Sequence, residues 1–312
     1  MGMTHRPSLL NHDRRHFLKT TSLATLGLPS LSAFSSDPSI YRQDTPGPDY
    51  KIKHHRIKQS VMGWCFNPMP MDELIDACHR MGMPAMEGIS RNFYPKLREL
   101  GMKPAIVGSH GFANGPVNPD NREVCISKIK EAINVAVEYG SPNVITFTGM
   151  SVKGMSQAEG ARNCIRCWKE VAGYAEDKGV NLCLEHLNSR DDTHPMKGHP
   201  GYFGDDVDFC IDLIEAVDSP RMKLLFDIYH VQVMNGDVTR RLRRVIDYIG
   251  HVHTAGVPGR AEIDETQELY YPAIMRVLLD LGYRGFVAQE FIPTWEDKLA
   301  ALRHGVNICD VD

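Results

Sequence analysis

The stretch Leu224–Gln232, LLFDIYHVQ, joins an apolar run to a carboxylate and a histidine. A short continuous apolar run is typical of a strand that is buried on both faces, as the strands of parallel sheets are. Asp227 ends the run, and His230 follows three residues later. An unpaired buried carboxylate costs several kcal/mol or shifts its pKa until it is neutral. The stretch therefore predicts a buried parallel strand whose last residue needs a compensating partner.

The same pattern recurs on both sides of this stretch, from about residue 55 onward. Short apolar runs alternate with longer amphipathic segments that have the helical period. The eight apolar runs are QSVMGWCF, PAMEGI, PAIVGSH, NVITFTG, NLCLEHL, KLLFDIY, GHVHTA and GFVAQEF. Eight strands alternating with eight helices predict an α/β fold, a single parallel (β/α)8 TIM barrel with right-handed crossovers.

A doubly wound open sheet is the second choice for such an alternating pattern. It would usually have fewer units and a glycine-rich phosphate loop after the first strand. The corresponding segment, 64–73, reads WCFNPMPMDE and contains no G-x-G-x-x-G. The pattern therefore favours the barrel over a dinucleotide-binding domain.

The N-terminal part of the chain differs from the rest and predicts an export signal. Arg14 and Arg15 are followed by Phe-Leu-Lys and then by a modestly apolar stretch up to about residue 34. A basic segment, a short apolar segment and small residues resemble a signal of the twin-arginine type. We expect a signal over residues 1–34, a proline-rich linker over 35–54, the barrel over 55–312, and a periplasmic location. A chance basic tail or an uncleaved anchor is the alternative.

The overall composition limits the classes of partner. The chain has 42% hydrophobic residues, 24% charged residues and a formal net charge of -4, so nothing favours nucleic-acid binding. After the first 40 residues no apolar run approaches the ~18 residues that span a membrane, so we expect no stable insertion once a signal is processed. Eight cysteines show no spacing typical of a disulfide framework. Cys164 and Cys167 form a CxxC on a helical segment, where core packing is the better interpretation than zinc binding.

Polar residues stand at the carboxyl ends of six predicted strands, which is where active sites lie in such barrels. They are Glu87, His110, Glu185, Asp227, His253 and Glu290. The last four come from consecutive strands, so they converge. Three carboxylates and an imidazole cannot be buried together as bare charges, and a divalent cation resolves their repulsion. This oxygen-rich set predicts Mg²⁺ or Mn²⁺, with Zn²⁺ as an alternative. For each residue taken alone, a helix N-cap or a salt bridge is the ordinary alternative.

The loops that follow these strands add cationic and hydrogen-bonding groups. Asn188, Arg190 and Asp191 follow the fifth strand, His230 follows the sixth, and Arg260 follows the seventh. Such groups around a metal are what a small, oxygen-rich, anionic substrate needs. For each arginine alone, solvation at the surface is the alternative.

Several stretches resemble the xylose isomerase-like barrel superfamily of sugar isomerases and epimerases, and within it the hydroxypyruvate isomerase family. The matching stretches, which cover most of residues 180–292, are LEHLNSRD, GYF, KLLFDIYHVQVMNGDVTR, IGHVHTAGVPGRAE, ELYYP and LGYRGFVAQE. The resemblance implies that Glu185 and Glu290 are catalytic glutamates that also bind the metal, and that Asp227 is a further ligand.

The resemblance also implies that His230 and Arg260 bind substrate. Glu87, His110 and Asp191 are further expected substrate-binding residues. One departure concerns His253, because hydroxypyruvate isomerases often have glutamine there and the sugar epimerases have histidine. With this difference, the predicted quartet is more epimerase-like.

The implied function is a metal-dependent isomerisation of a small hydroxy-carbonyl or sugar substrate, such as hydroxypyruvate to 2-hydroxy-3-oxopropanoate. Two glutamates would move a proton between neighbouring carbons through an enediolate. The alternatives are a ketose 3-epimerase, a polyol dehydratase or a metal-dependent phosphodiesterase on the same site, or a non-catalytic exported sugar-binding protein. A homo-oligomer is an open expectation.

Overall fold

The computed structural model describes residues 45–312 of the chain. The expected signal and most of the expected linker lie outside the described residues, so both stay predictions. Within residues 45–312, no helix has the length and apolar character needed to cross a membrane.

Within residues 45–312, eight parallel strands follow one another around a barrel. They are β1 (Lys58–Val61), β2 (Ala85–Met86), β3 (Lys103–Pro104), β4 (Asn143–Thr146), β5 (Asn181–Glu185), β6 (Met222–Asp227), β7 (Ile249–Thr254) and β8 (Phe286–Gln289). Six form one sheet in the order β1-β8-β7-β6-β5-β4, and β2 pairs with β3. Parallel bridges Met62–Glu87 and Val107–Val144 join these two sheets and complete the ring. The predicted TIM barrel is confirmed.

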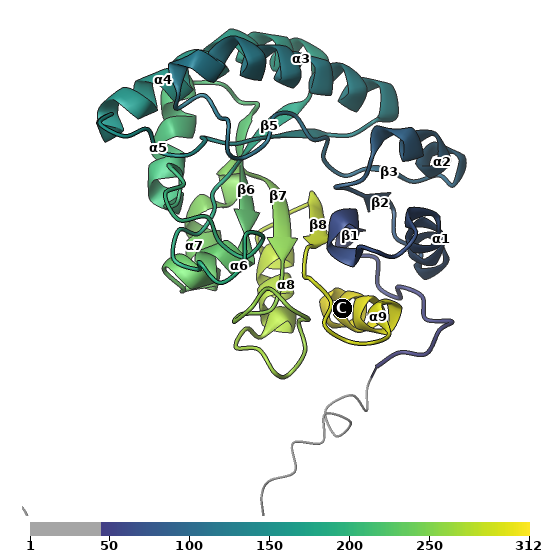
Figure 1. Ribbon diagram of the computed structural model, residues 1–312. Coiled ribbons are helices and arrows are strands. Elements are labelled where there is room, and N and C mark those ends of the chain that lie inside the picture. The colour runs from purple at the N-terminus through teal and green to yellow at the C-terminus, as the bar shows by residue number, and fades with distance from the viewer. Residues whose placement is uncertain (1–44) are drawn as a thin grey trace, which may run out of the picture. The chain divides into compact units, whose positions relative to one another are not determined.

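The helices lie outside the strands, as Figure 1 shows for α3, α4 and α5 around one side of the barrel. The helices are α1 (Met71–Met81), α2 (Tyr94–Glu99), α3 (Arg122–Tyr139), α4 (Gln157–Lys178), α5 (Val207–Val217), α6 (Ile228–Met234), α7 (Val238–Val245), α8 (Tyr271–Asp280) and α9 (Lys298–Cys309). Short 3-10 helices are Gly63–Phe66, Arg91–Phe93, Pro119–Asn121 and Ile246–Tyr248. Apolar residues on the inner faces of the long helices pack onto the strands, and this burial stabilises the fold.

The residues at the ends of α4 are of the types that commonly cap helices. Ser156 accepts a hydrogen bond from the amide of Glu159 at the start of α4, and Gly179 ends that helix in the left-handed region, at φ 69°. Cys164 and Cys167 lie on the buried face of α4, as predicted for core residues.

Strand register brings the predicted polar residues to one end of the barrel. Asp227 on β6 stands directly opposite His253 on β7. Glu185 is the last residue of β5, and Glu290 follows β8 directly, with its amide donating to the carbonyl of Thr254. These four residues therefore meet where their strands end, as expected for parallel strands of one barrel.

Candidate active site

Glu185, Asp227, His253 and Glu290 form one buried cluster at the carboxyl ends of the strands. One ligand atom from each lies within 4.8 Å of the others. Nδ1 of His253 is 2.6 Å from Oε2 of Glu290 and 3.3 Å from Oε1 of Glu185. The structure thus brings together the four residues for which the sequence predicts a metal-binding role.

The two oxygens of Asp227 have different partners. Oδ1 accepts hydrogen bonds from the amides of Tyr229, at 2.8 Å, and His230, at 3.2 Å, and so caps the N-terminus of α6. Oδ2 faces the cluster and lies 3.5 Å from a guanidinium nitrogen of Arg260. The ordinary interpretation of Asp227 as a helix cap is therefore confirmed for Oδ1. The role of Oδ2 as a metal ligand stays a prediction, and this oxygen is free of the cap.

Arg260 places a positive charge inside the cluster. Its Nη2 lies 2.7 Å from Oε2 of Glu290, and the side chain is buried. Although burial opposes ionisation, the charges of Arg260 and His253 lower the pKa of Glu290 to about 2. The backbone of Arg260 has a φ of 55°, which residues other than glycine rarely adopt. Strain of this kind is typical of functional positions.

The pKa values of the other three members of the cluster are shifted by burial and by the neighbouring charges. Burial and then the charge of Glu290 raise the pKa of Asp227 to about 7. Burial also raises the pKa of Glu185. Burial favours a neutral ring at His253, but Glu290 and Glu185 outweigh it and raise the pKa of that ring well above its usual value. These shifts are what a site built for an additional positive charge should show in its absence.

The buried atoms without hydrogen bonds test the fit of a cation. Among residues 45–312, Oε1 of Glu185, Oε2 of Glu290 and Nδ1 of His253 are buried and lack a hydrogen bond of ordinary geometry. Oε2 of Glu290 lies 2.6 Å from Nδ1 of His253 and 2.7 Å from Nη2 of Arg260, but these contacts are ion pairs and not hydrogen bonds of ordinary geometry. Buried polar atoms normally have hydrogen bonds, so this group of atoms, in which ligand atoms lie within 4.8 Å of one another, indicates a place for a further partner. Carboxylate oxygens with one imidazole fit a divalent cation.

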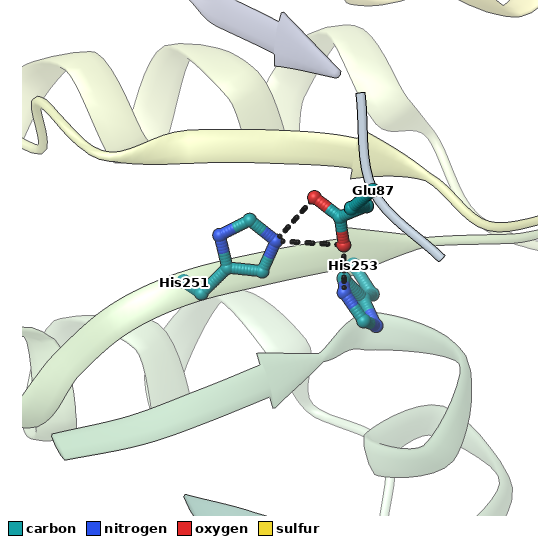
Figure 2. Close-up of side chains that lie close together, drawn as sticks. All are labelled: Glu87, His251 and His253. Carbon is teal, nitrogen blue, oxygen red and sulfur yellow. Dashed lines mark hydrogen bonds and ion pairs between the residues drawn. The ribbon is translucent and has the colours of Figure 1, made fainter. Parts of the chain in front are cut away.

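Glu87 lies behind His253, away from the quartet. Figure 2 shows its carboxylate between His251 and His253, with Nε2 of His253 at 2.8 Å from Oε1. The hydroxyl of Ser60 donates to Oε2 at 2.9 Å. Both oxygens are thus occupied and the side chain is fully buried, which argues against the substrate-binding role predicted for Glu87. His251, whose Nε2 lies 3.0 Å from Oε2, had no predicted role.

His230 presents one ring nitrogen to the cluster. Its Nδ1 accepts from the backbone amide of Asn188 at 3.1 Å, so the ring proton is on Nε2. Nε2 lies 3.5 Å from Oδ2 of Asp227 and, within the described part of the chain, has no hydrogen bond. Burial, and next the charge of Arg260, lower the pKa of His230 well below its usual value, so the ring is neutral. A neutral N–H donor beside the cluster is compatible with the predicted contact to substrate oxygens.

Three other residues singled out from the sequence have partners elsewhere. Nε2 of His110 pairs with the hydroxyl of Thr146 at 2.9 Å, and its Nδ1 pairs with the carbonyl of Gly111. Arg190 is exposed, as in its ordinary interpretation.

Asp191 accepts from the hydroxyl of Tyr229 at 3.0 Å and from Thr193. It thereby fastens the loop to α6. For Asp191, as for His110, substrate binding stays a prediction.

The loop 189–200, which follows β5, contacts the cluster through Arg260. Nη1 of Arg260 donates to the carbonyl of Met196 at 2.6 Å. The side-chain amide of Asn188 donates to the carbonyl of Lys197, and the ring centroid of His199 lies 4.1 Å from that of Phe112. The loop therefore packs against Arg260.

Comparisons with known proteins agree with this fold. Residues 71–307 match the family model described as xylose isomerase-like TIM barrel. A 2-oxo-tetronate isomerase of Cupriavidus necator is 32% identical over 165 residues, which are 53% of this chain and 60% of that protein. A hydroxypyruvate isomerase of Escherichia coli is 26% identical over 175 residues, which are 56% of this chain and 65% of that protein. The matches thus span about three fifths of the length of these relatives.

Among solved structures, the chain is similar to an AP endonuclease, family 2, from Brucella melitensis. The TM-score is 0.69 at 23% sequence identity, and the match covers 79% of this chain and 96% of that one. This likeness supports the barrel fold.

Proposed function

Because the chain belongs to the xylose isomerase-like TIM barrel family, we propose that it is a metal-dependent isomerase of a small hydroxy-carbonyl compound. The substrate that we favour is hydroxypyruvate, which would become 2-hydroxy-3-oxopropanoate. The observation that carries the proposal is the pair Glu185 and Glu290, whose buried oxygens lack hydrogen bonds of ordinary geometry and belong to one cluster of ligand atoms within 4.8 Å of one another. The names of the two curated relatives support the reaction class.

Four residues would hold the cation: Glu185, Asp227, His253 and Glu290. A divalent cation there would supply Lewis acidity, which makes the C–H next to a carbonyl more acidic. Arg260 and the N–H of His230 lie beside this cluster and would orient the carboxylate and oxygens of the substrate.

The two glutamates would then act as the general base and the general acid of the isomerisation. One of them removes a proton from the carbon that bears the hydroxyl group, which leaves an enediolate. The other glutamate, which enters the step protonated, gives its proton to the former carbonyl carbon, while the hydroxyl proton passes to the former carbonyl oxygen. Proton exchange with solvent then returns both glutamates to their starting states. Substrate and product are isomers, so no redox partner is needed.

A ketose 3-epimerase is the second candidate. It would use the same two glutamates, and His253 is the residue that favours it, because the family resemblance implies histidine at this position in the sugar epimerases. Both reactions exchange a carbon-bound proton with solvent, whereas a non-catalytic sugar-binding protein exchanges none.

The test is proton exchange. We expect the Mn²⁺-loaded protein to incorporate deuterium into hydroxypyruvate or a ketose in D₂O, and Glu185→Gln and Glu290→Gln to abolish the exchange. Comparison of hydroxypyruvate with a ketose panel separates the two candidates. Absence of exchange with every compound in the panel would overturn the proposal.

We also propose that the protein is exported through the pair Arg14 and Arg15. Replacement of both by lysine should retain the protein in the cytoplasm of a host with a twin-arginine pathway, as cell fractionation would show. Equal periplasmic recovery of the two forms would refute this.

A further inference from the structure

Glu87 and His251 form a second buried cluster that shares His253 with the first. Oε1 of Glu87 lies 2.8 Å from Nε2 of His253 and 3.1 Å from Nε2 of His251. Figure 2 shows the two imidazoles converging on this carboxylate. All three side chains are fully buried.

The residue types alone would allow a second metal ion, because Glu87, His251 and His253 offer ligand atoms within 4.8 Å of one another. Their hydrogen bonds argue otherwise. Both oxygens of Glu87 already accept hydrogen bonds, from Ser60 on one side and the two histidines on the other. Among residues 45–312, the buried atoms without a hydrogen bond include atoms of the quartet. They include neither oxygen of Glu87 and neither the Nε2 of His251 nor that of His253.

We propose that Glu87 is a positioning residue, which holds the ring of His253 so that Nδ1 faces the cation. A carboxylate that accepts from Nε2–H fixes the tautomer in which Nδ1 is free of a proton. It also orients the ring and increases the basicity of Nδ1 as a ligand. The geometry matches, since Nδ1 is the nitrogen that points at Glu185 and Glu290. This inference rests on the metal site of the proposed function.

His251 and Ser60 keep Glu87 in place and ionised. His251 approaches both oxygens, at 3.1 Å and 3.0 Å, and Ser60 donates to Oε2. Although burial opposes ionisation, His251 and His253 hold the pKa of Glu87 well below its usual range. An ionised acceptor forms the stronger hydrogen bond to Nε2–H of His253.

The test measures Mn²⁺ affinity directly, by isothermal titration of chelator-treated protein. Loss of a partner of this kind typically weakens metal binding about 10- to 100-fold. We expect a loss of that size in Glu87→Ala and a smaller one in Glu87→Gln, whose amide oxygen can still accept from Nε2–H. Asp310→Asn is the matched control, because Asp310 is also a buried carboxylate, but its oxygens accept from the amides of Lys53 and His54.

A spectroscopic measurement separates positioning from general destabilisation. In Co²⁺-substituted protein the d–d absorption reports ligand geometry. We expect Glu87→Ala to change this spectrum, Glu87→Gln to restore it largely, and Asp310→Asn to leave it unchanged. If Glu87→Ala does not fold, Glu87→Gln carries the test through its Mn²⁺ affinity.

The outcomes are distinguishable. If wild-type protein binds Mn²⁺ and both Glu87 variants bind it within about twofold of wild type, the positioning role is wrong and the metal site stands. If the wild-type protein itself binds no divalent cation, the proposed metal site fails and the inference fails with it.

Discussion

Arg260 joins the loop 189–200 to Glu290, one of the two predicted catalytic carboxylates: its Nη2 lies 2.7 Å from Oε2 of Glu290, and its Nη1 donates to the carbonyl of Met196 at 2.6 Å. One guanidinium therefore contacts a predicted catalytic group and the loop that lies against it. Its charge also compensates Glu290, which keeps that carboxylate ionised. We expect both the position of the loop 189–200 and the ionisation of Glu290 to depend on the side chain of Arg260.

The first prediction concerns Arg260→Lys. Lysine keeps the charge but lacks the planar fork that reaches Glu290 and Met196 together. We therefore expect the variant to lose a charge-assisted hydrogen bond to the carboxylate of the substrate. Such a loss costs about 1.5–3 kcal/mol, so KM for hydroxypyruvate should rise about 10- to 100-fold. Arg190→Lys is the control, because Arg190 is an exposed arginine on the loop 189–200 that contains Met196. Steady-state kinetics with equal KM values for both variants would contradict a role of Arg260 in substrate binding.

A second prediction concerns Tyr202, whose hydroxyl donates to the carbonyl of Glu185 at 2.9 Å and accepts from the amide of Thr148 at 3.0 Å. Tyr202→Phe leaves a buried carbonyl and a buried amide unsatisfied, at a cost of about 1–3 kcal/mol. Chemical denaturation should show this loss. Tyr270→Phe is the matched control, because Tyr270 is 69% exposed, and its stability should not change. A Tyr202→Phe protein as stable as the control would show that water replaces the hydroxyl.

The barrel and its quartet could be predicted from the sequence because both depend on local signals. Alternating apolar and amphipathic segments specify the strands, and parallel strands of one barrel place their carboxyl ends together. The position of Asp227 at the end of an apolar run, together with polar residues at the ends of three neighbouring strands, predicted that it lies in the cluster. Its second role, as the cap of α6, was foreseen only as an alternative.

The partners of Glu87 could not be predicted in the same way. Glu87 and His251 are 164 positions apart, and their contact depends on how the side chains fill the barrel interior. One signal was present: His251 and His253 are two residues apart on a strand, so they point to the same face. The contact of Arg260 with Met196 depends on two loop conformations, which residue spacing does not specify.

The third prediction separates the two oxygens of Asp227. Asn caps a helix about as well as Asp, so Asp227→Asn should keep the start of α6, whereas Asp227→Ala should lose about 1 kcal/mol with the cap. Both variants lose the charged oxygen that faces the cluster, so both should lose Mn²⁺ binding. Denaturation of the metal-free protein and calorimetric Mn²⁺ titration measure the two effects. If Asp227→Asn binds Mn²⁺ as wild type does, Oδ2 is not a ligand.

The fourth prediction concerns pH. Burial, and next the charge of Glu290, raise the pKa of Asp227 from 3.8 to about 7 in the folded protein. Protonation of Asp227 therefore contributes to the free energy of unfolding of the metal-free protein. This contribution is fully present below pH 3.8 and is lost as pH rises through about 7. A cation must displace the proton below pH 7 but not above it. The increase in Tm on adding Mn²⁺ should thus be larger at about pH 8 than at about pH 6.

Asp227→Asn provides the control for this pH effect, because it removes the titrating group and the ligand together. Its Tm should not respond to Mn²⁺ at either pH, and without metal it should be at least as stable as wild type at about pH 8, where the buried charge of Asp227 is destabilising. Differential scanning calorimetry at matched ionic strength measures both quantities. A Mn²⁺-induced rise in Tm that is equal at the two pH values in wild-type protein would show that Asp227 is already ionised at the lower pH. Its raised pKa would then not govern metal binding.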